Sequence, residues 1–227
     1  MKIAILGYGK MGRAIEKIAL QRGHEVVLKI NSQNPADTAD FSVVEVAIDF
    51  STPDTAFNNI NTALTQGIPV ISGTTAWLEK QAEAEQLAIE NSTAFLYASN
   101  FSVGVNLFFE LNKKLTQLIS NHKQYQANMK EIHHTHKLDA PSGTAISLAK
   151  DMKGEIHIES ERTGEFPGTH IITYQSQIDT IEIKHEAHNR KGFALGAVLA
   201  SEWIKDKKGV FSMNDMLNKK EQYKHNE

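Results

Sequence analysis

The sequence predicts an α/β fold organised around a doubly wound parallel sheet. Short apolar runs rich in Val and Ile alternate with longer amphipathic stretches in the N-terminal half of the chain. The first run leads into a G-x-G-x-x-G pattern, and later runs also end in glycine or polar turns. Alternating strands and helices are typical of parallel sheets with helices on both faces. The 227 residues suffice for one large or two small domains.

The first strand is expected at Lys2 to Leu6, because a continuous apolar run suits a parallel strand buried on both faces. A helix is expected at Arg13 to Arg22, where Ile15, Ile18 and Ala19 share one side. The glycines between them permit a tight turn and a close approach to a pyrophosphate at the helix N-terminus. A tight turn alone would also explain them, but the strand–turn–helix context favours a dinucleotide site at Gly7, Tyr8, Gly9, Lys10, Met11 and Gly12.

The second strand is expected at His24 to Ile30, and residues just after it would contact the adenosine ribose. A carboxylate there holds the ribose of NAD and repels the 2′-phosphate of NADP, but the chain has Lys29, Asn31 and Ser32 instead. Strand alternation would put Lys29 and Asn31 on one face, so that both or neither reach the ribose. We expect Asn31 in the cofactor site and either a mild preference for NADPH or the use of both cofactors, although Lys29 could also be a solvated surface charge.

Three further strands are expected at Val43 to Phe50, Ile68 to Ser72 and Thr93 to Tyr97. Helices should follow the first two of them, from Pro53 to about Gln66 and from Trp77 to Glu90. Ligands of doubly wound sheets lie at the carboxyl ends of the strands. The loops that start at Gly7, Gly73 and Ala98 all fall there, although each taken singly could be a structural turn.

The C-terminal half begins with a predicted helix from Val103 to Ser120. Its leucine stripe is interpreted as core or interface; the stripe consists of Leu107, Leu111, Leu115 and Leu118. The other predicted elements are a strand ending near His136, a helix at Thr144 to Met152, strands at Thr169 to Ser176 and Asp179 to Ala187, a helix at Phe193 to Ile204 and closing elements at Val210 to Leu217. We expect a variable region at Lys153 to Thr169 and a polar tail from Asn218.

The stretch from Glu131 to Ala149 combines groups that transfer protons with groups that bind anions. Three histidines and Lys137 lie at the end of a predicted strand, and a helix N-terminus follows after Pro141. Unpaired N–H groups and a partial positive charge at such a terminus suit a carboxylate or phosphate. Metal binding ranks behind proton transfer, because the usual zinc spacings are missing. A surface histidine cluster without a role is the other alternative.

Composition narrows the function classes. The net charge of −3 gives no bulk attraction for nucleic acid or an acidic membrane. There are no cysteines, which excludes disulfides and thiolate catalysis. No apolar run approaches the roughly 20 residues of a membrane helix, and the N-terminal apolar run is too short for a signal peptide. We therefore expect a cytoplasmic protein that acts on small molecules.

In its motifs the chain resembles the family of dihydrodipicolinate (4-hydroxy-tetrahydrodipicolinate) reductases of lysine and diaminopimelate biosynthesis. The motifs that carry the resemblance occur in family order: GYGKMGRAI, DFSTP, GTT, NFSVGVN, HHTHKLDAPSGTA and HNRKGFALGAVLASEWI. The resemblance implies a Rossmann-type domain at 1–100 plus about 200–227. It also implies an inserted second α/β domain with a mixed sheet at 101–199, which binds substrate and builds a homotetramer.

The resemblance also implies an activity and the residues that carry it. The reaction is NADPH- or NADH-dependent reduction of a cyclic imine dicarboxylate, with His133 as the acid and Lys137 as the second catalytic group. No metal is implied. The implied substrate-binding residues are His134, Ser142, Gly143 and Thr144. Besides the first glycine loop and Asn31, the implied cofactor-binding residues are Gly73, Thr74, Thr75, Ala98, Ser99, Asn100 and Phe101.

Four departures and two classes of rival, a sensor and another Rossmann reductase, stand beside this interpretation. The chain is short for the family, with the missing residues expected after Met152, and the acidic residue after the second strand is absent. Ala76 stands where many members have glycine, and Ser99 stands where alanine or proline is common. A dinucleotide sensor without turnover would share the fold but would have no use for an acid at His133. A semialdehyde dehydrogenase would need a catalytic cysteine, which the chain lacks, and a homoserine dehydrogenase is a weaker rival.

Overall fold

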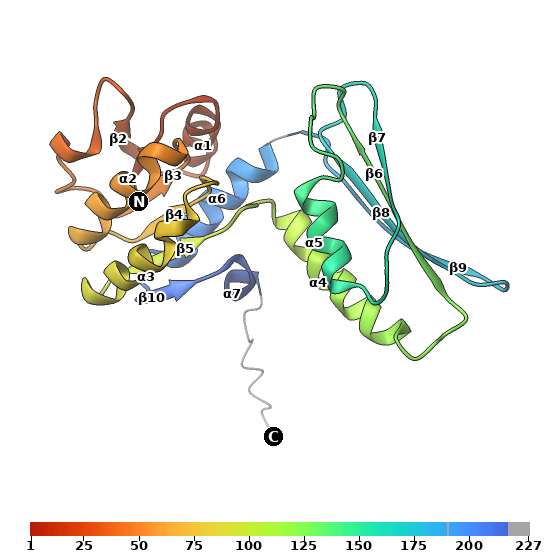
Figure 1. Ribbon diagram of the computed structural model, residues 1–227. Helices are drawn as coiled ribbons and strands as arrows, with labels where there is room; N and C mark the ends of the chain where they lie inside the picture. Colours follow the sequence, from red (N-terminus) through yellow and green to blue (C-terminus); the bar gives the residue numbers. More distant parts are fainter. Residues whose placement is uncertain (190, 218–227) are drawn as a thin grey trace. The chain divides into compact units, whose positions relative to one another are not determined.

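The computed structural model describes residues 1–189 and 191–217. The contacts divide the chain into two compact units (Figure 1). Unit 1 comprises Met1–Val103 and the chain from Phe193 on, and unit 2 comprises Gly104–Gly192. The predicted polar tail from Asn218 lies outside the described residues. None of the described helices is long and apolar enough to cross a membrane.

Unit 1 is built on a six-stranded sheet in the order β10-β5-β4-β3-β1-β2, and all of its strand pairs are parallel. Its strands are β1 (Lys2–Leu6), β2 (Glu25–Ile30), β3 (Val46–Asp49), β4 (Val70–Ser72), β5 (Ala94–Tyr97) and β10 (Gly209–Phe211). Its helices are α1 (Lys10–Gln21), α2 (Pro53–Thr65), α3 (Gln81–Glu90), α6 (Lys191–Ile204) and α7 (Met213–Leu217), with short 3₁₀ turns at Ala36–Thr38 and Leu78–Lys80. The predicted doubly wound parallel sheet is confirmed.

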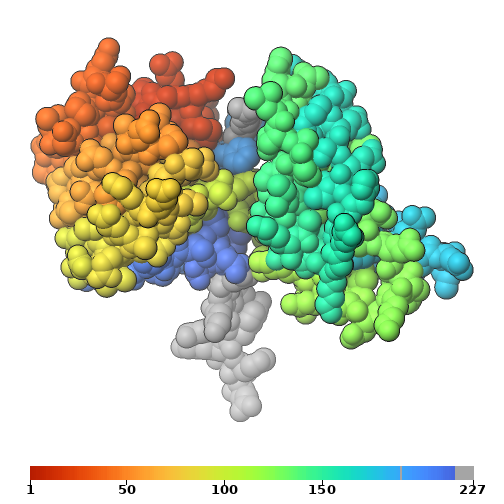
Figure 2. All heavy atoms as spheres, viewed as in Figure 1, coloured from red at the N-terminus to blue at the C-terminus, as the bar shows by residue number. Residues whose placement is uncertain are grey.

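The central strands of this sheet are buried on both faces, which explains why they are mostly apolar. Ile3 and Ile5 of β1 pack with α1 and α6 in one core, and Ala4 and Leu6 pack with α2 and α3 in the other. In the space-filling view, α2 and α3 (orange to yellow) cover the second of these faces (Figure 2). The strand order reverses between β1 and β3, where ligands bind in such sheets.

Unit 2 contains a mixed four-stranded sheet in the order β7-β6-β8-β9. Its elements are α4 (Val103–Ile119), β6 (Gln126–His133), α5 (Gly143–Asp151), β7 (Ile158–Arg162), β8 (Thr169–Gln175) and β9 (Thr180–Glu186). β6 is parallel to β7 and antiparallel to β8. Figure 1 shows α4 and α5 on one face of the sheet, where Phe108, Leu148, Met129 and Ile172 form the core.

Several sequence-based expectations differ from this structure. β7 lies inside the region that was expected to be variable, and β6 ends at His133 because a turn begins at His134. The predicted second domain extended to residue 199, but α6 lies in unit 1 because Ala194, Ala197 and Val198 pack in its core.

The leucine stripe of α4 is also not core within unit 2. Leu107, Leu111 and Leu118 are 52%, 50% and 61% exposed. The opposite side of the helix is buried and includes the polar residues Asn112 and Thr116. Hydrogen bonds compensate part of this burial, since the Asn112 amide donates to the Leu148 carbonyl at 3.0 Å and the Thr116 hydroxyl pairs with the Tyr174 hydroxyl at 2.8 Å, whereas Oδ1 of Asn112 has no partner among the described residues. A role of the stripe in an interface stays a prediction.

Candidate active site

The first glycine loop connects β1 to α1 in a conformation that other residues would not tolerate. Gly7 has φ +94°, and a Cβ on it would lie 2.3 Å from the Phe50 carbonyl oxygen. A Cβ on Gly12 would lie 2.6 Å from the Gly7 carbonyl oxygen. In contrast, nothing lies within 4 Å of a Cβ built on Gly9. Gly9 is the N-cap of α1 and caps it with no side-chain hydrogen bond, so this terminus suits a pyrophosphate.

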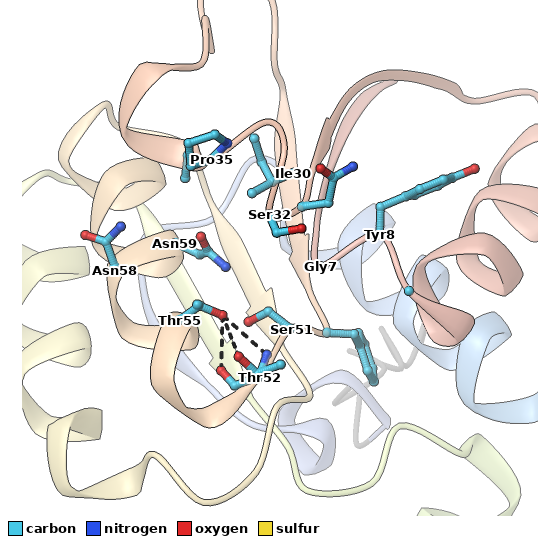
Figure 3. Close-up of a pocket in the computed structure, with 14 residues that line it drawn as sticks. Gly7, Tyr8, Ile30, Ser32, Pro35, Ser51, Thr52, Thr55, Asn58 and Asn59 are labelled. Atoms are coloured by element: carbon cyan, nitrogen blue, oxygen red, sulfur yellow. Dashed lines mark hydrogen bonds between the residues drawn. The ribbon is translucent and has the colours of Figure 1, made fainter.

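A cavity of about 460 Å³ opens beside this loop at the carboxyl ends of β1, β2 and β3 (Figure 3). Gly7 and Tyr8 lie on one wall, and Thr52, Thr55 and Asn59 lie on the opposite one. Its lining residues are Gly7, Tyr8, Gly9, Ile30, Asn31, Ser32, Pro35, Ala36, Phe50, Ser51, Thr52, Thr55, Asn58 and Asn59. The geometry fits the adenosine half of a dinucleotide, because the cavity lies at the strand reversal and adjoins the glycine loop.

Asn31 and Lys29 have different contacts. Asn31 lines the cavity, and its side-chain oxygen accepts the backbone N–H groups of Gln33 and Asn34 at 2.8 and 3.1 Å. The Lys29 ammonium binds Glu16 at 2.5 Å and lies 4.8 Å from the centroid of the Tyr8 ring. Asn31 lies just beyond the end of β2 at Ile30, and of the two residues only Asn31 lines this cavity. The expectation that both or neither reach the ribose stays a prediction.

A second cavity of about 200 Å³ lies at the ends of β3 and β4 and is lined by Met11, Phe50, Ser51, Pro53, Gly73, Thr74 and Thr75. It shares Phe50 and Ser51 with the first cavity. A Cβ on Gly73 would lie 2.3 Å from Cζ of Phe50, so the glycine allows this ring to pack against the loop. The predicted positions Met11, Gly73, Thr74 and Thr75 therefore come together around one hollow.

The Asp49 side chain connects the loops after β3 and β4 through hydrogen bonds. Its buried carboxylate accepts hydrogen bonds from the hydroxyls of Ser51 at 2.6 Å, Ser72 at 2.8 Å and Thr74 at 2.7 Å. The Thr74 hydroxyl oxygen in turn accepts the Ser51 backbone N–H at 2.8 Å. Burial raises the pKa of Asp49 to about 6, although these hydrogen bonds oppose the rise. The loops after β3 and β4 are thus held as one framework.

The remaining predicted cofactor positions line neither cavity; they are Lys10, Gly12, Ala98, Ser99, Asn100 and Phe101. Ala98 follows β5 beside the second cavity's loop, since its N–H donates to the Ser72 carbonyl at 3.1 Å. Phe101 is buried, and its ring lies 5.6 Å from the ring of Phe50. Phe101 therefore supports the wall that Phe50 forms.

In unit 2, β6 places Glu131 and His133 on the same buried face, two residues apart. The Nδ1 atom of His133 lies 3.2 Å from Oε2 of Glu131. Burial lowers the pKa of His133, while the charge of Glu131 opposes that shift. Glu131 was not singled out by sequence reasoning, although period-two alternation along β6 would have placed it beside His133.

The turn after β6 carries His134 and Lys137. The His134 backbone N–H donates to the Phe166 carbonyl at 2.9 Å, and the Lys137 N–H donates to the His134 carbonyl at 3.1 Å. The Lys137 ammonium binds both carboxylate oxygens of Asp139, at 2.7 and 2.9 Å. His133, the last residue of β6, is buried, whereas Lys137 in the turn that follows is partly exposed.

The helix N-terminus of α5 is connected directly to β6. Ser142 is its N-cap, and its hydroxyl oxygen accepts the Ala145 backbone N–H at 3.1 Å. The Ser142 backbone N–H donates to Oε1 of Glu131 at 3.0 Å. Gly143 is exposed and a Cβ on it would meet nothing within 4 Å, and Thr144 is half-buried beside it. The first turn of α5 is therefore open to an anion.

The histidines that sequence reasoning grouped are separated by the structure. His134 and His136 lie in the turn with ring centroids 6.2 Å apart, whereas His133 points to the buried face and lies 5.2 Å from the ring of His170. Ligand atoms of Glu131, His133 and His170 lie within 4.8 Å of one another. The Arg162 guanidinium lies 2.9 Å from the same carboxylate and opposes a further cation there.

Two family models cover almost the whole described chain. Residues 1–101 match the model for the N-terminus of dihydrodipicolinate reductase, and residues 104–217 match the model for its C-terminus.

Curated relatives with the same activity in their names are similar over nearly their full lengths. The 4-hydroxy-tetrahydrodipicolinate reductase of Christiangramia forsetii is 48% identical over 96% of this chain and 98% of its own. The enzyme of the same name from Thermosipho africanus is 35% identical over the same shares of each chain. The chain spans 98% of the length of both relatives. The expectation of a chain that is short for the family stays a prediction.

Solved structures share the fold. The dipicolinate-bound dihydrodipicolinate reductase from Paenisporosarcina sp. TG-14 has a TM-score of 0.77 at 21% identity and covers 93% of this chain and 97% of that one. Aspartate semialdehyde dehydrogenase II from Vibrio cholerae has a TM-score of 0.54 at 12% identity, covering 88% and 97%.

Proposed function

This chain belongs to the dihydrodipicolinate reductase family, and on that premise we propose that it reduces 4-hydroxy-tetrahydrodipicolinate to tetrahydrodipicolinate with NADH or NADPH. The observation that carries the proposal is the arrangement in unit 2. A buried imidazole and an open helix N-terminus are joined through Glu131, and a lysine lies in the turn between them. These groups are the ones that a dicarboxylate requiring a proton would use.

We assign the cofactor to unit 1. When bound, the nicotinamide supplies the hydride. Gly9 leaves open space at the uncapped N-terminus of α1, which suits the pyrophosphate. The cavity beside it offers Asn31 to the adenosine ribose, and the smaller hollow at Gly73 to Thr75 offers hydroxyls and backbone groups to the rest of the dinucleotide.

We assign the substrate to unit 2. Its carboxylates would bind the N–H groups of Gly143 and Thr144 and the ammonium of Lys137. Lys137 already holds a carboxylate, that of Asp139, at 2.7 Å. A substrate carboxylate would share or replace this partner.

His133 is the proposed acid. Hydride addition leaves negative charge on the substrate ring, and a proton from His133 neutralises it at the neighbouring carbon. Burial favours the neutral imidazole, but two substrate carboxylates would favour the protonated form by adding negative charge nearby.

The homotetramer and the cytoplasmic location implied by the resemblance belong to the same proposal. Small dicarboxylates are consistent with the dipicolinate named for the solved relative. Gel filtration with light scattering measures the oligomer directly. A dimer or monomer at working concentration would overturn the tetramer without affecting the assigned chemistry.

The experiment that tests the function is consumption of NADPH and NADH with enzymatically generated substrate, with and without the protein. Turnover that depends on the protein supports the proposal. Dinucleotide binding without any turnover would support the rival function, a sensor with the same fold. Binding measured by calorimetry in parallel separates that result from a failure to bind the cofactor.

A further inference from the structure

A cluster of polar side chains is buried behind His133, and the proposed chemistry does not use it. Glu131 has no exposed surface, and His170 and Ser142 are also buried. The three residues come from β6, β8 and the start of α5, so the cluster joins three elements of unit 2. Cross-strand pairing places Glu131 opposite His170 on one side and opposite Ser160 on the other.

One oxygen of the Glu131 carboxylate is fully occupied. Its Oε1 accepts the Ser142 backbone N–H at 3.0 Å, the Ser160 hydroxyl at 2.8 Å and the Arg162 guanidinium at 2.9 Å. Burial alone would raise the pKa of Glu131, but these hydrogen bonds hold it lowered, at about 2. The group is therefore a fixed carboxylate at every pH at which an enzyme of this kind works.

Two histidine rings lie near the other oxygen of this carboxylate. Oε2 lies 3.2 Å from Nδ1 of His133 and 3.8 Å from Nε2 of His170. The His170 Nε2 atom also lies 3.3 Å from the Ser142 hydroxyl, which gives that ring a different partner. A buried carboxylate oxygen left without a proton donor is costly, so the nearer ring is the one expected to donate.

The opposite side of the His133 ring faces backbone. A Cβ on Gly168 would lie 2.9 Å from Nε2 of His133, and Gly168 has φ +150°. Only a glycine leaves that nitrogen clear at this place. Nδ1 of the ring therefore lies 3.2 Å from the fixed carboxylate, within ion-pair distance but without the alignment of a hydrogen bond, and Nε2 lies beside a residue without a side chain.

We propose that Glu131 is a positioning residue that fixes His133 in the tautomer with hydrogen on Nδ1, so that Nε2 carries the proton given to the substrate. In the transfer, the Nε2–H bond breaks and a C–H bond forms on the substrate ring. His133 changes from imidazolium to neutral imidazole and keeps its Nδ1–H, while Glu131 stays a carboxylate throughout. This inference rests on the proposed acid role of His133 and adds the group that orients it.

The direct test is a histidine ¹⁵N spectrum of the unmodified full-length protein across a pH series. The His133 signals are assigned by their loss in His133→Gln. The inference predicts that Nδ1 stays protonated throughout and that only Nε2 titrates. A neutral His133 with hydrogen on Nε2 would overturn it, even if the protein is an active reductase. The spectrum also gives its answer if the protein shows no turnover, so the two proposals fail separately.

The kinetic test is Glu131→Gln, which removes the charge but keeps the size of the side chain. We expect a loss of kcat of about tenfold or more near neutral pH, with activity partly regained at lower pH, because the imidazolium loses its stabilising charge. The pH profile also includes the charges of Lys137, Asp139 and Arg162 and the neighbouring His170. Glu159→Gln, an exposed residue of β7 that pairs with Lys130, is the matched control and should leave the profile unchanged.

Two further outcomes contradict the inference. An equal loss of activity at every pH in Glu131→Gln, with the profile in place, would make Glu131 merely structural. A change of the His133 signals on treatment with EDTA would place a metal ion between the carboxylate and the ring. If Glu131→Gln does not fold, as judged by circular dichroism, the spectrum of the unmodified protein decides alone.

Discussion

The backbone N–H of Ser142 donates a hydrogen bond to Oε1 of Glu131 over 3.0 Å. This bond joins the first residue of the α5 cap to the strand that carries His133. The proposed anion site and the proposed acid therefore contact the same buried carboxylate. A substitution at the N-cap of α5 should alter both sites.

Ser142→Ala tests this connection. The substitution removes the hydroxyl that accepts the Ala145 N–H and that contacts His170. We expect a loss of about 1 kcal/mol in the free energy of unfolding, as for other N-caps, together with a raised substrate KM because the first turn of α5 loosens. Ser147→Ala on the same helix is the control, since its exposed hydroxyl only contacts the Gly143 carbonyl. Equal KM values in the two variants would contradict a role of the cap in substrate binding.

Asp49 should make stability depend on pH. Its pKa is raised from 3.8 to about 6 in the folded protein, so the folded state holds the proton more tightly than the unfolded state. Stability from this group is present at low pH and is lost as pH rises from about 4 through about 6, by roughly 3 kcal/mol in total. The stability of the parent relative to Asp49→Asn should fall over that window in urea titrations.

The exposed residue Asp54, in the first turn of α2, provides the control for this prediction. The stability of the parent relative to Asp54→Asn should not fall in this way over the same pH window, since the Asp54 side chain is exposed. A constant difference between the parent and Asp49→Asn across the same pH range would show that burial does not perturb Asp49.

Ala76 follows the Gly-Thr-Thr loop with φ +61°, a left-handed conformation that strains any residue with a Cβ. Ala76→Gly should raise the free energy of unfolding by about 0.5–1 kcal/mol, because relief of strain exceeds the added entropy of the unfolded chain. Ala82→Gly, at an exposed helical position of α3, should lower it instead. Destabilisation by both substitutions in urea titrations would refute the strain at Ala76.

Cofactor preference should depend on Asn31. Because Lys29 is bound to Glu16, it adds little attraction for a 2′-phosphate, and the uncharged Asn31 neither attracts nor repels one. We predict comparable kcat/KM for NADPH and NADH in the parent. Asn31→Asp should shift the ratio toward NADH by about tenfold, since one like-charge contact in a partly wet site is worth about 1–2 kcal/mol. An unchanged ratio would show that another residue contacts the ribose.

The parallel sheet could be predicted because its central strands are buried on both faces and are therefore short apolar runs in the sequence. The first loop could be predicted because a tight turn between a strand and a helix requires glycines. β7 was missed because Ile158 to Arg162 is mostly charged and lies on a sheet with one open face, which gives little apolar signal. The core half of the α4 stripe prediction failed because the buried side of the helix includes the polar residues Asn112 and Thr116, which hydrogen-bond to tertiary partners. The interface half stays a prediction.

The candidate site likewise contains residues that the sequence could identify and residues that it could not. His133, Lys137 and the α5 terminus could be found because they are close in sequence. Arg162 and His170 could not, because only the pairing of β7 and β8 with β6 brings them to Glu131. Contacts across strands depend on register, which a single sequence does not specify.

The most direct test of the account is the rate of NADPH oxidation with enzymatically generated 4-hydroxy-tetrahydrodipicolinate, compared between the parent and His133→Gln. Cofactor affinity, measured separately by fluorescence, should be the same in both, since His133 lies in unit 2. We predict protein-dependent turnover in the parent and a kcat lower by about 10²–10⁴ in the variant, the usual effect of removing a general acid. Near-parental turnover in the variant, or no turnover in a parent that binds NADPH, would contradict the account.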